Sequence, residues 1–301
     1  MYPQGQQQPG FNYSGGYPQS GGYPPQGGYP PQGGYLPQGG YASSGGYPPY
    51  GGGGGGPQVN LNFGPGVADS SGLFAEKAIR QAFVSKVYSM LTLQLVFTSI
   101  LIGMFVLNDA TKKHFASHTG QGWLWLGFAI FFVSYLILVC VESARRTTPM
   151  NLILLFVLTF GYGLVAAITS CRYDTKVVFF AFVATGASCF LIALFAKSTS
   201  FDMTNCGTTL CLIVVAHMII GTIMTLVLAS MGYAKIATLL LSVSGALIVS
   251  LYLIFDLQLI MGGRKCEISP EEYILACVML YTDIVQMFIY MLEIFSRLSD
   301  D

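Results

Sequence analysis

Charged side chains are scarce in this chain, and their scarcity excludes most classes of soluble protein. Only 9% of the 301 residues are Asp, Glu, Lys or Arg, against roughly 25% in an average soluble domain. The 14 basic and 14 acidic residues cancel, so no net charge favours nucleic acid, and we expect none as a partner. A chain this apolar is typical of an integral membrane protein.

Clustered cysteines and a signal peptide are also missing. The seven cysteines are scattered, several of them inside apolar runs, with no Cys-x-x-Cys or Cys/His group. An odd number without clustering argues against a disulfide scaffold or a zinc site, and we expect no cofactor. The N-terminus has no basic region followed by an apolar one, so we expect the first membrane helix to direct insertion.

The first 70 residues form a region of their own by composition. Residues 1–68 carry no charge and repeat Gly-Gly-Tyr every six residues from Gly15 to Gly45. So much glycine and proline leaves too little apolar surface to offset the entropy of ordering the backbone. We therefore predict a disordered tail at 1–70 and a membrane domain at 71–301. The regular Tyr and Pro favour either weak multivalent binding of protein partners by the tail or a passive tether.

Seven apolar runs follow, each close to the roughly 20 residues that span about 30 Å of hydrocarbon. They lie at 87–107, 123–141, 149–169, 177–196, 208–229, 236–259 and 273–294. Helices suit such runs, because lipid cannot satisfy an open sheet edge. We predict an all-α membrane protein, a seven-transmembrane-helix bundle in contact with membrane lipid. Before the first run, 73–86 places apolar residues on one face, which predicts a short helix lying in the membrane interface.

Lys and Arg in the predicted loops indicate the orientation of the bundle. One side holds eight: Lys77, Arg80, Lys86, Arg145, Arg146, Lys197, Arg264 and Lys265. The other side holds six: Lys112, Lys113, Arg172, Lys176, Lys235 and Arg297. The difference favours a cytosolic N-terminus and, with an odd number of helices, a C-terminus across the membrane.

Two aspartates lie inside predicted membrane helices, where an ionised group is costly and by default indicates function. Asp256 lies near the end of the sixth helix and Asp283 inside the seventh, and these helices are antiparallel neighbours. Counted from the loop that joins them, their depths differ by roughly 8 Å at about 1.5 Å per residue, a gap that helix tilt can close. We predict a carboxylate pair; the alternative is that each Asp satisfies separate neighbouring groups.

Such a pair has a defined chemistry. Two carboxylates that share a low-dielectric site cannot both ionise cheaply, so the pair holds one proton. The shared proton would keep the two helices together, and its loss would make them repel and admit a cation. Two carboxylates are too few for a tight calcium cage of about six to eight oxygens. Asp256 and Asp283 are therefore predicted to sense pH and to bind calcium ions only transiently.

Two other features have more than one interpretation. Glu142, Arg145 and Arg146 lie where the second helix ends; they form either a solvated interfacial cluster or, through an inward-reaching arginine, a partner for the aspartates. Thr159-Phe-Gly-Tyr-Gly163 superficially resembles a potassium selectivity filter, but such filters are unwound loops in a pore. Within a spanning helix, its two glycines instead predict close packing against another helix.

Five segments carry a resemblance to a known family. They are Arg80-Gln-Ala-Phe-Val-Ser-Lys-Val-Tyr-Ser89, Arg145-Arg-Thr-Thr-Pro-Met-Asn151, Phe255-Asp-Leu-Gln-Leu-Ile-Met-Gly-Gly263, Ile268-Ser-Pro-Glu-Glu-Tyr273 and Leu280-Tyr-Thr-Asp283. Together they resemble the transmembrane BAX inhibitor motif family, in its Lifeguard branch, over about residues 78–296. The Gly/Pro/Tyr-rich tail is similar to that of one Lifeguard member.

The resemblance implies a seven-helix fold with the last helix central, a pH-sensitive calcium leak from intracellular stores, and suppression of apoptosis. It implies a multi-pass protein of the endoplasmic reticulum or Golgi membrane that is not an enzyme. The family's aspartate pair corresponds to Asp256 and Asp283, and its basic partner to Arg145 or Arg146. Leu280-Tyr-Thr-Asp283 departs slightly from the Leu-Tyr-Leu-Asp of many relatives, and the founding member's lysine-rich C-terminal tail has no counterpart here.

Two other functions fit part of this pattern. Presenilin-like intramembrane proteases also place one Asp on each of two adjacent helices, where the pair activates water. They read Gly-x-Gly-Asp at the second aspartate and need a Pro-Ala-Leu segment, and neither occurs in this sequence. A non-conducting scaffold that regulates cell death through protein partners is the stronger alternative. It predicts that neutralising both aspartates leaves the cellular effect intact.

Overall fold

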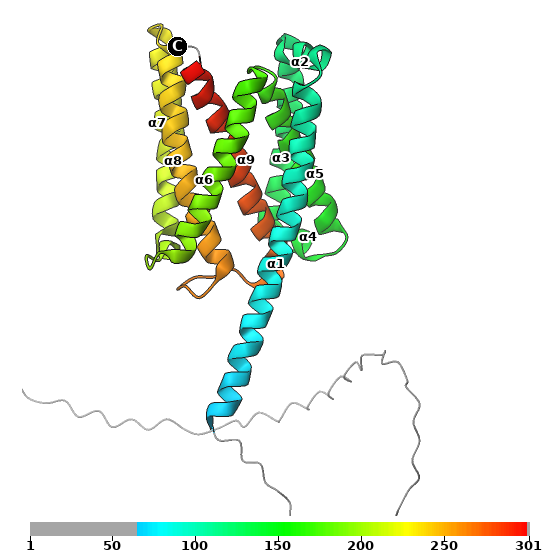
Figure 1. Ribbon diagram of the computed structural model, residues 1–301, viewed down its shortest axis with the longest axis vertical. Coiled ribbons are helices and arrows are strands. Elements are labelled where there is room, and N and C mark those ends of the chain that lie inside the picture. The colour runs from blue at the N-terminus through cyan, green and yellow to red at the C-terminus, as the bar shows by residue number, and fades with distance from the viewer. Residues whose placement is uncertain (1–64, 300–301) are drawn as a thin grey trace, which may run out of the picture. The chain divides into compact units, whose positions relative to one another are not determined.

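The computed structural model describes residues 65–299, which contain helices and no strand (Figure 1). Its helices are α1 (Pro65–Val106), α2 (Asp109–Ala116), α3 (His118–Cys140), α4 (Glu142–Arg146), α5 (Met150–Ser170), α6 (Thr175–Ser198), η1 (Met203–Cys206), α7 (Gly207–Ser230), α8 (Ala234–Met261), η2 (Pro270–Glu272) and α9 (Tyr273–Ser299). The predicted disordered tail at 1–70 lies almost wholly outside the described residues and stays a prediction.

Seven of these helices are long and apolar enough to cross a membrane: α1, α3, α5, α6, α7, α8 and α9. Each covers one of the predicted apolar runs, so the predicted all-α bundle of seven spanning helices is confirmed. The first run differs in one respect. The separate interfacial helix predicted over 73–86 is instead continuous with α1. No Gly or Pro occurs between residues 73 and 102, so nothing in this stretch ends the helix.

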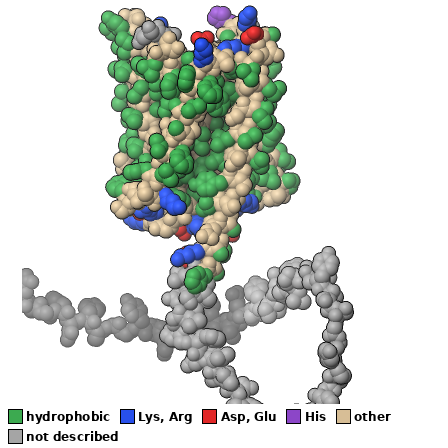
Figure 2. Space-filling model, viewed as in Figure 1, with side chains coloured by type: hydrophobic (Ala, Val, Ile, Leu, Met, Phe, Trp, Pro, Cys, Tyr) green, Lys and Arg blue, Asp and Glu red, His purple; other side chains and the backbone are tan. Residues whose placement is uncertain are grey.

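The bundle has two polar ends and an apolar middle. The α4 end holds α4, η1 and η2, and the opposite α2 end holds α2 and the turns that join α5 to α6 and α7 to α8 (Figure 1). Charged side chains gather at these ends, with a broad apolar band between them (Figure 2). Large apolar side chains of the spans are exposed on this band. An apolar surface of this extent suits lipid, and the protein is a multi-pass membrane protein.

The last helix, α9, lies in the middle of the bundle, as predicted. It contacts α1, α3, α5, α6 and α8, and Figure 1 shows it crossing between them. Its Tyr281 hydroxyl is 2.8 Å from the Thr98 hydroxyl of α1 and donates to the Thr159 carbonyl of α5 at 3.1 Å. Because lipid supplies no hydrogen-bond partners, such internal bonds between helices satisfy polar groups that a spanning bundle buries.

The glycines of the predicted packing motif bring α5 close to its neighbours. A methyl group on Gly161 would lie 2.6 Å from the backbone nitrogen of Phe131 in α3. One on Gly163 would lie 3.4 Å from the Thr98 hydroxyl of α1. The segment is helical throughout, so its glycines serve helix packing, as the sequence predicts, and it is not an unwound filter.

Candidate functional site

The turn between α8 and α9 sets these two helices antiparallel and side by side. Helix α8 ends at Met261 and is followed by Gly262, whose φ is 72°, and Gly263, whose φ is 73°. This left-handed region strains residues that carry a Cβ, so two glycines in a row reverse the chain at low cost. Asp256 of α8 and Asp283 of α9 are thereby placed on helices that pack against each other.

The side chains of the two aspartates lie close enough to interact directly. Asp256 is 4% exposed. The Oδ2 atom of Asp283 is buried, and among residues 65–299 no N–H or hydroxyl group donates to it. Ionised carboxylates only accept hydrogen bonds, so a bond between two carboxyl groups requires a proton on one of them. Two carboxyl groups this close can share one proton, and the shared proton stays a prediction.

Several other helices surround this pair. Tyr135 of α3, Tyr162 of α5 and Cys189 of α6 all lie within electrostatic range of an aspartate. Neither aspartate lines the cavity of about 220 Å³ between α1, α6 and α9, or that of about 680 Å³ between α1, α6 and α8. Asp256 and the Oδ2 atom of Asp283 therefore face protein, in a setting where ionising both carboxyl groups is costly.

Arg145 and Arg146 lie at the α4 end, where both form ion pairs with Glu272 of η2. Arg145 Nε is 2.5 Å from Glu272 Oε2, and Arg146 Nη2 is 2.5 Å from Glu272 Oε1. Arg146 also pairs with Glu142 at 2.7 Å, and its hydrogen bond to Glu272 raises its pKa. The structure thus brings the two aspartates together, but both arginines form ion pairs with glutamates and not with the aspartates. A role for either arginine in gating stays a prediction.

Two anchoring residues were not predicted from the sequence. One is Glu272, which joins both arginines to the start of α9. The other is Gln258, 1% exposed, whose amide donates to the Phe201 carbonyl at 3.0 Å and accepts from the Met203 amide at 2.8 Å. It fixes α8 to the loop between α6 and α7. Its signal was available, since an amide two residues after Asp256 interrupts an apolar run and needs partners in lipid.

Replacing Glu272 with glutamine is expected to lower the free energy of unfolding by about 1–3 kcal/mol, because two charged hydrogen-bonded pairs are lost. Thermal unfolding of the purified protein in detergent measures the loss. The matched control is Glu271→Gln, since the neighbouring carboxylate is 75% exposed and reaches Arg146 only at 3.8 Å. Equal stability losses in the two variants would show that Glu272 is not the anchor.

A seven-helix membrane bundle with a carboxyl pair buried between its last two helices is the class of protein that this geometry defines. Residues 80–300 match the family model described as "Inhibitor of apoptosis-promoting Bax1". The match covers most of the chain, and the chain belongs to this family, as the resemblance predicted.

Individual relatives agree with this assignment. The chain is similar to human Protein lifeguard 3, with 33% identity over 236 residues, 78% of this chain and 73% of that protein. Mouse Protein lifeguard 3 is 30% identical over 77% of this chain and 72% of its own length. Mouse Protein lifeguard 4 is 29% identical over 78% of this chain and 90% of its own length.

Proposed function

We propose that this protein is a pH-sensitive calcium leak channel of the endoplasmic reticulum or Golgi membrane, and a negative regulator of apoptosis. The observation that carries the proposal is the direct approach of the Asp256 and Asp283 side chains inside the bundle, where Asp256 and the Oδ2 atom of Asp283 are buried. The family description and the Lifeguard relatives support the part in apoptosis. The protein acts without a cofactor and is not an enzyme.

The aspartate pair acts as a latch between α8 and α9. With one proton, its carboxyl groups bind each other and hold the helices in contact. When the proton leaves, two negative charges about 4 Å apart repel by about 4 kcal/mol in a protein-like dielectric. The separated carboxylates then offer oxygen ligands to a calcium ion. Two such ligands bind the ion weakly enough for it to leave, as conduction requires.

Arg145 and Arg146 hold the start of α9, the helix that is proposed to move. Their ion pairs with Glu272 fix η2, and with it the start of α9, to α4. A separation of α8 from α9 therefore takes place deeper in the membrane, where the aspartates lie, while the α4 end stays closed around its charges. We propose that the α4 end and the N-terminus face the cytosol, because this end carries eight basic residues against six at the other end.

The proposal is tested by calcium flux through the purified protein in dye-loaded liposomes between about pH 6 and 8. Flux above that of empty liposomes is expected, and it should rise with pH, because loss of the shared proton opens the latch. Asp202→Asn is the control. Hydrogen bonds from Thr204 lower the pKa of Asp202, which lies outside the spans, so its carboxylate stays ionised over this range and its removal should leave the pH profile unchanged.

Two outcomes would contradict the proposal. Flux no greater than in empty liposomes at every pH would remove the channel and favour the non-conducting scaffold. In cells, the scaffold predicts that the variant carrying both Asp256→Asn and Asp283→Asn suppresses cell death as well as the wild type does. The latch predicts that this variant suppresses cell death less well.

A further inference from the structure

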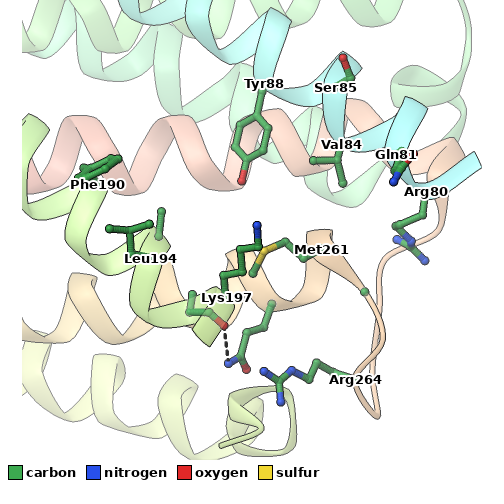
Figure 3. Close-up of a pocket in the computed structure, with 14 residues that line it drawn as sticks. Arg80, Gln81, Val84, Ser85, Tyr88, Phe190, Leu194, Lys197, Met261 and Arg264 are labelled. Carbon is green, nitrogen blue, oxygen red and sulfur yellow. Dashed lines mark hydrogen bonds between the residues drawn. The ribbon is translucent and has the colours of Figure 1, made fainter. Parts of the chain in front are cut away.

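A cavity of about 680 Å³ opens between α1, α6 and α8 at the α4 end of the bundle. Tyr88 of α1 and Lys197 of α6 approach each other across it, and Arg264 lies at its edge, just past the end of α8 (Figure 3). Gln258 and Ala196, two more lining residues, are joined by a hydrogen bond of 3.4 Å. This hydrogen bond joins α8 to α6, so Gln258 fixes the relative position of two of the helices that enclose the cavity.

The charged residues that line this cavity are all basic: Arg80, Lys197 and Arg264. Arg80 is already neutralised, because it pairs with Glu267 at 2.8 Å. Arg264 donates to the carbonyls of Thr199 and Ser200, which leaves its charge in place, although Asp202 lies within its electrostatic range. Within the described part of the chain, no hydrogen bond or ion pair engages the Lys197 ammonium. The cavity therefore has positive charge on Lys197 and Arg264 that no ion pair neutralises within the described part of the chain.

The cavity also has an apolar wall, which extends away from these cations along α6. Phe190 and Leu194 lie seven and three residues before Lys197, on the same face of α6. They are 63% and 50% exposed, and both line the cavity. Because they belong to a membrane-spanning helix, this wall continues from the charged end into the hydrocarbon layer.

A cationic end joined to an apolar wall matches the chemistry of one class of molecule. We infer that this cavity binds an anionic phospholipid, with its phosphate at Lys197 and Arg264 and an acyl chain along Phe190 and Leu194. The Tyr88 hydroxyl is placed to donate a third hydrogen bond to the headgroup (Figure 3). Charge-assisted hydrogen bonds to phosphate are among the strong ones, whereas a zwitterionic lipid brings its own cation next to the basic residues and gains less.

Soluble phosphates fit this site less well than a lipid does. A free phosphate, or a headgroup without chains, would use the cations but leave the apolar wall uncovered. A lipid in the surrounding bilayer reaches both at once and loses less freedom on binding than a solute does. The inference does not depend on the proposed channel, because it rests on the cavity alone.

The test is native mass spectrometry of the full-length protein, released from micelles that contain equimolar phosphatidylserine and phosphatidylcholine. The wild type is expected to retain phosphatidylserine in preference. Lys197→Gln should weaken this retention roughly fivefold, the effect of one lysine charge near an anionic headgroup. Because Lys197 is exposed and engages no partner among residues 65–299, the substitution should leave folding unchanged, which thermal unfolding checks.

Two further variants separate the site from general attraction to anionic lipid. Lys265→Gln removes one charge from the same end of the bundle, outside the lining of the cavity, and should leave retention unchanged. Leu194→Trp keeps every charge but fills the apolar wall, and should reduce retention as Lys197→Gln does.

Each of three results would overturn the inference. The first is equal retention of the two lipids by the wild type. The second is equal weakening by Lys197→Gln and Lys265→Gln. The third is displacement of phosphatidylserine by an equal concentration of inorganic phosphate, which would make this a site for free phosphate. The experiment measures lipid binding without calcium. Its outcome therefore does not bear on the proposed channel, and failure of the channel proposal would not change the lipid result.

Discussion

Asp256→Asn and Asp283→Asn are each expected to hold calcium flux near its low, acidic level from about pH 6 to 8. Asparagine cannot ionise, and its amide donates to the remaining carboxylate, so either variant keeps a bridge between α8 and α9 at every pH. A single proton titrating over two pH units changes the ratio of open to closed latch by at most roughly a hundredfold. We expect a decrease of about tenfold or more at pH 8, measured in dye-loaded liposomes.

The two variants also test whether the aspartates act as a pair. Because one proton belongs to both carboxyl groups, the single variants and the double variant should have similar pH profiles. A profile that is lost in one single variant and kept in the other would assign the titration to one aspartate alone and contradict the shared latch. Thermal unfolding of each variant separates lost flux from lost folding.

Gln258→Leu is expected to lower the free energy of unfolding by about 2–4 kcal/mol. The side chain is almost fully buried and bonds to the carbonyls of Phe201 and Ala196 and to the amide of Met203. Leucine has a similar size but leaves these backbone groups unpaired. An unpaired group costs about 1–3 kcal/mol when it is fully buried, and the groups of Phe201 and Met203 are only partly buried, so each of them contributes less. Thermal unfolding in detergent measures the loss. The control is Gln81→Leu, at an exposed position of α1, which should change stability little; an equally small effect of Gln258→Leu would show that this anchor is dispensable.

The spanning helices were predictable because the thickness of hydrocarbon fixes both their length and their composition. The contact between Asp256 and Asp283 also follows from the sequence, since antiparallel neighbours joined by a short loop bring residues of similar depth together. Their difference in depth, roughly 8 Å on straight helices, is overcome in the packed structure. How α9 packs among five spanning helices is a property of the whole bundle, which no local sequence pattern contains.

Other features were beyond the sequence for identifiable reasons. The sequence offers several acidic residues as partners for Arg145 and Arg146. Only the fold brings η2 next to α4, where Glu272 pairs with both arginines. The length of α1 was underestimated because an amphipathic pattern over 73–86 does not show whether the helix stops, and this one continues into the first span. The cavity at Lys197 joins three helices that are far apart in the sequence.

The most direct test of the latch is to observe its proton by infrared spectroscopy of the protein in bilayers. The spectrum of the wild type is compared with that of the variant carrying both Asp256→Asn and Asp283→Asn, from about pH 6 to 8. A latch with one shared proton predicts a carboxylic-acid C=O band in the wild type that is absent from the variant and fades over the pH interval in which calcium flux rises. No difference between the two proteins in the carboxylic-acid C=O region at any pH would show that neither aspartate holds a proton and would contradict the latch.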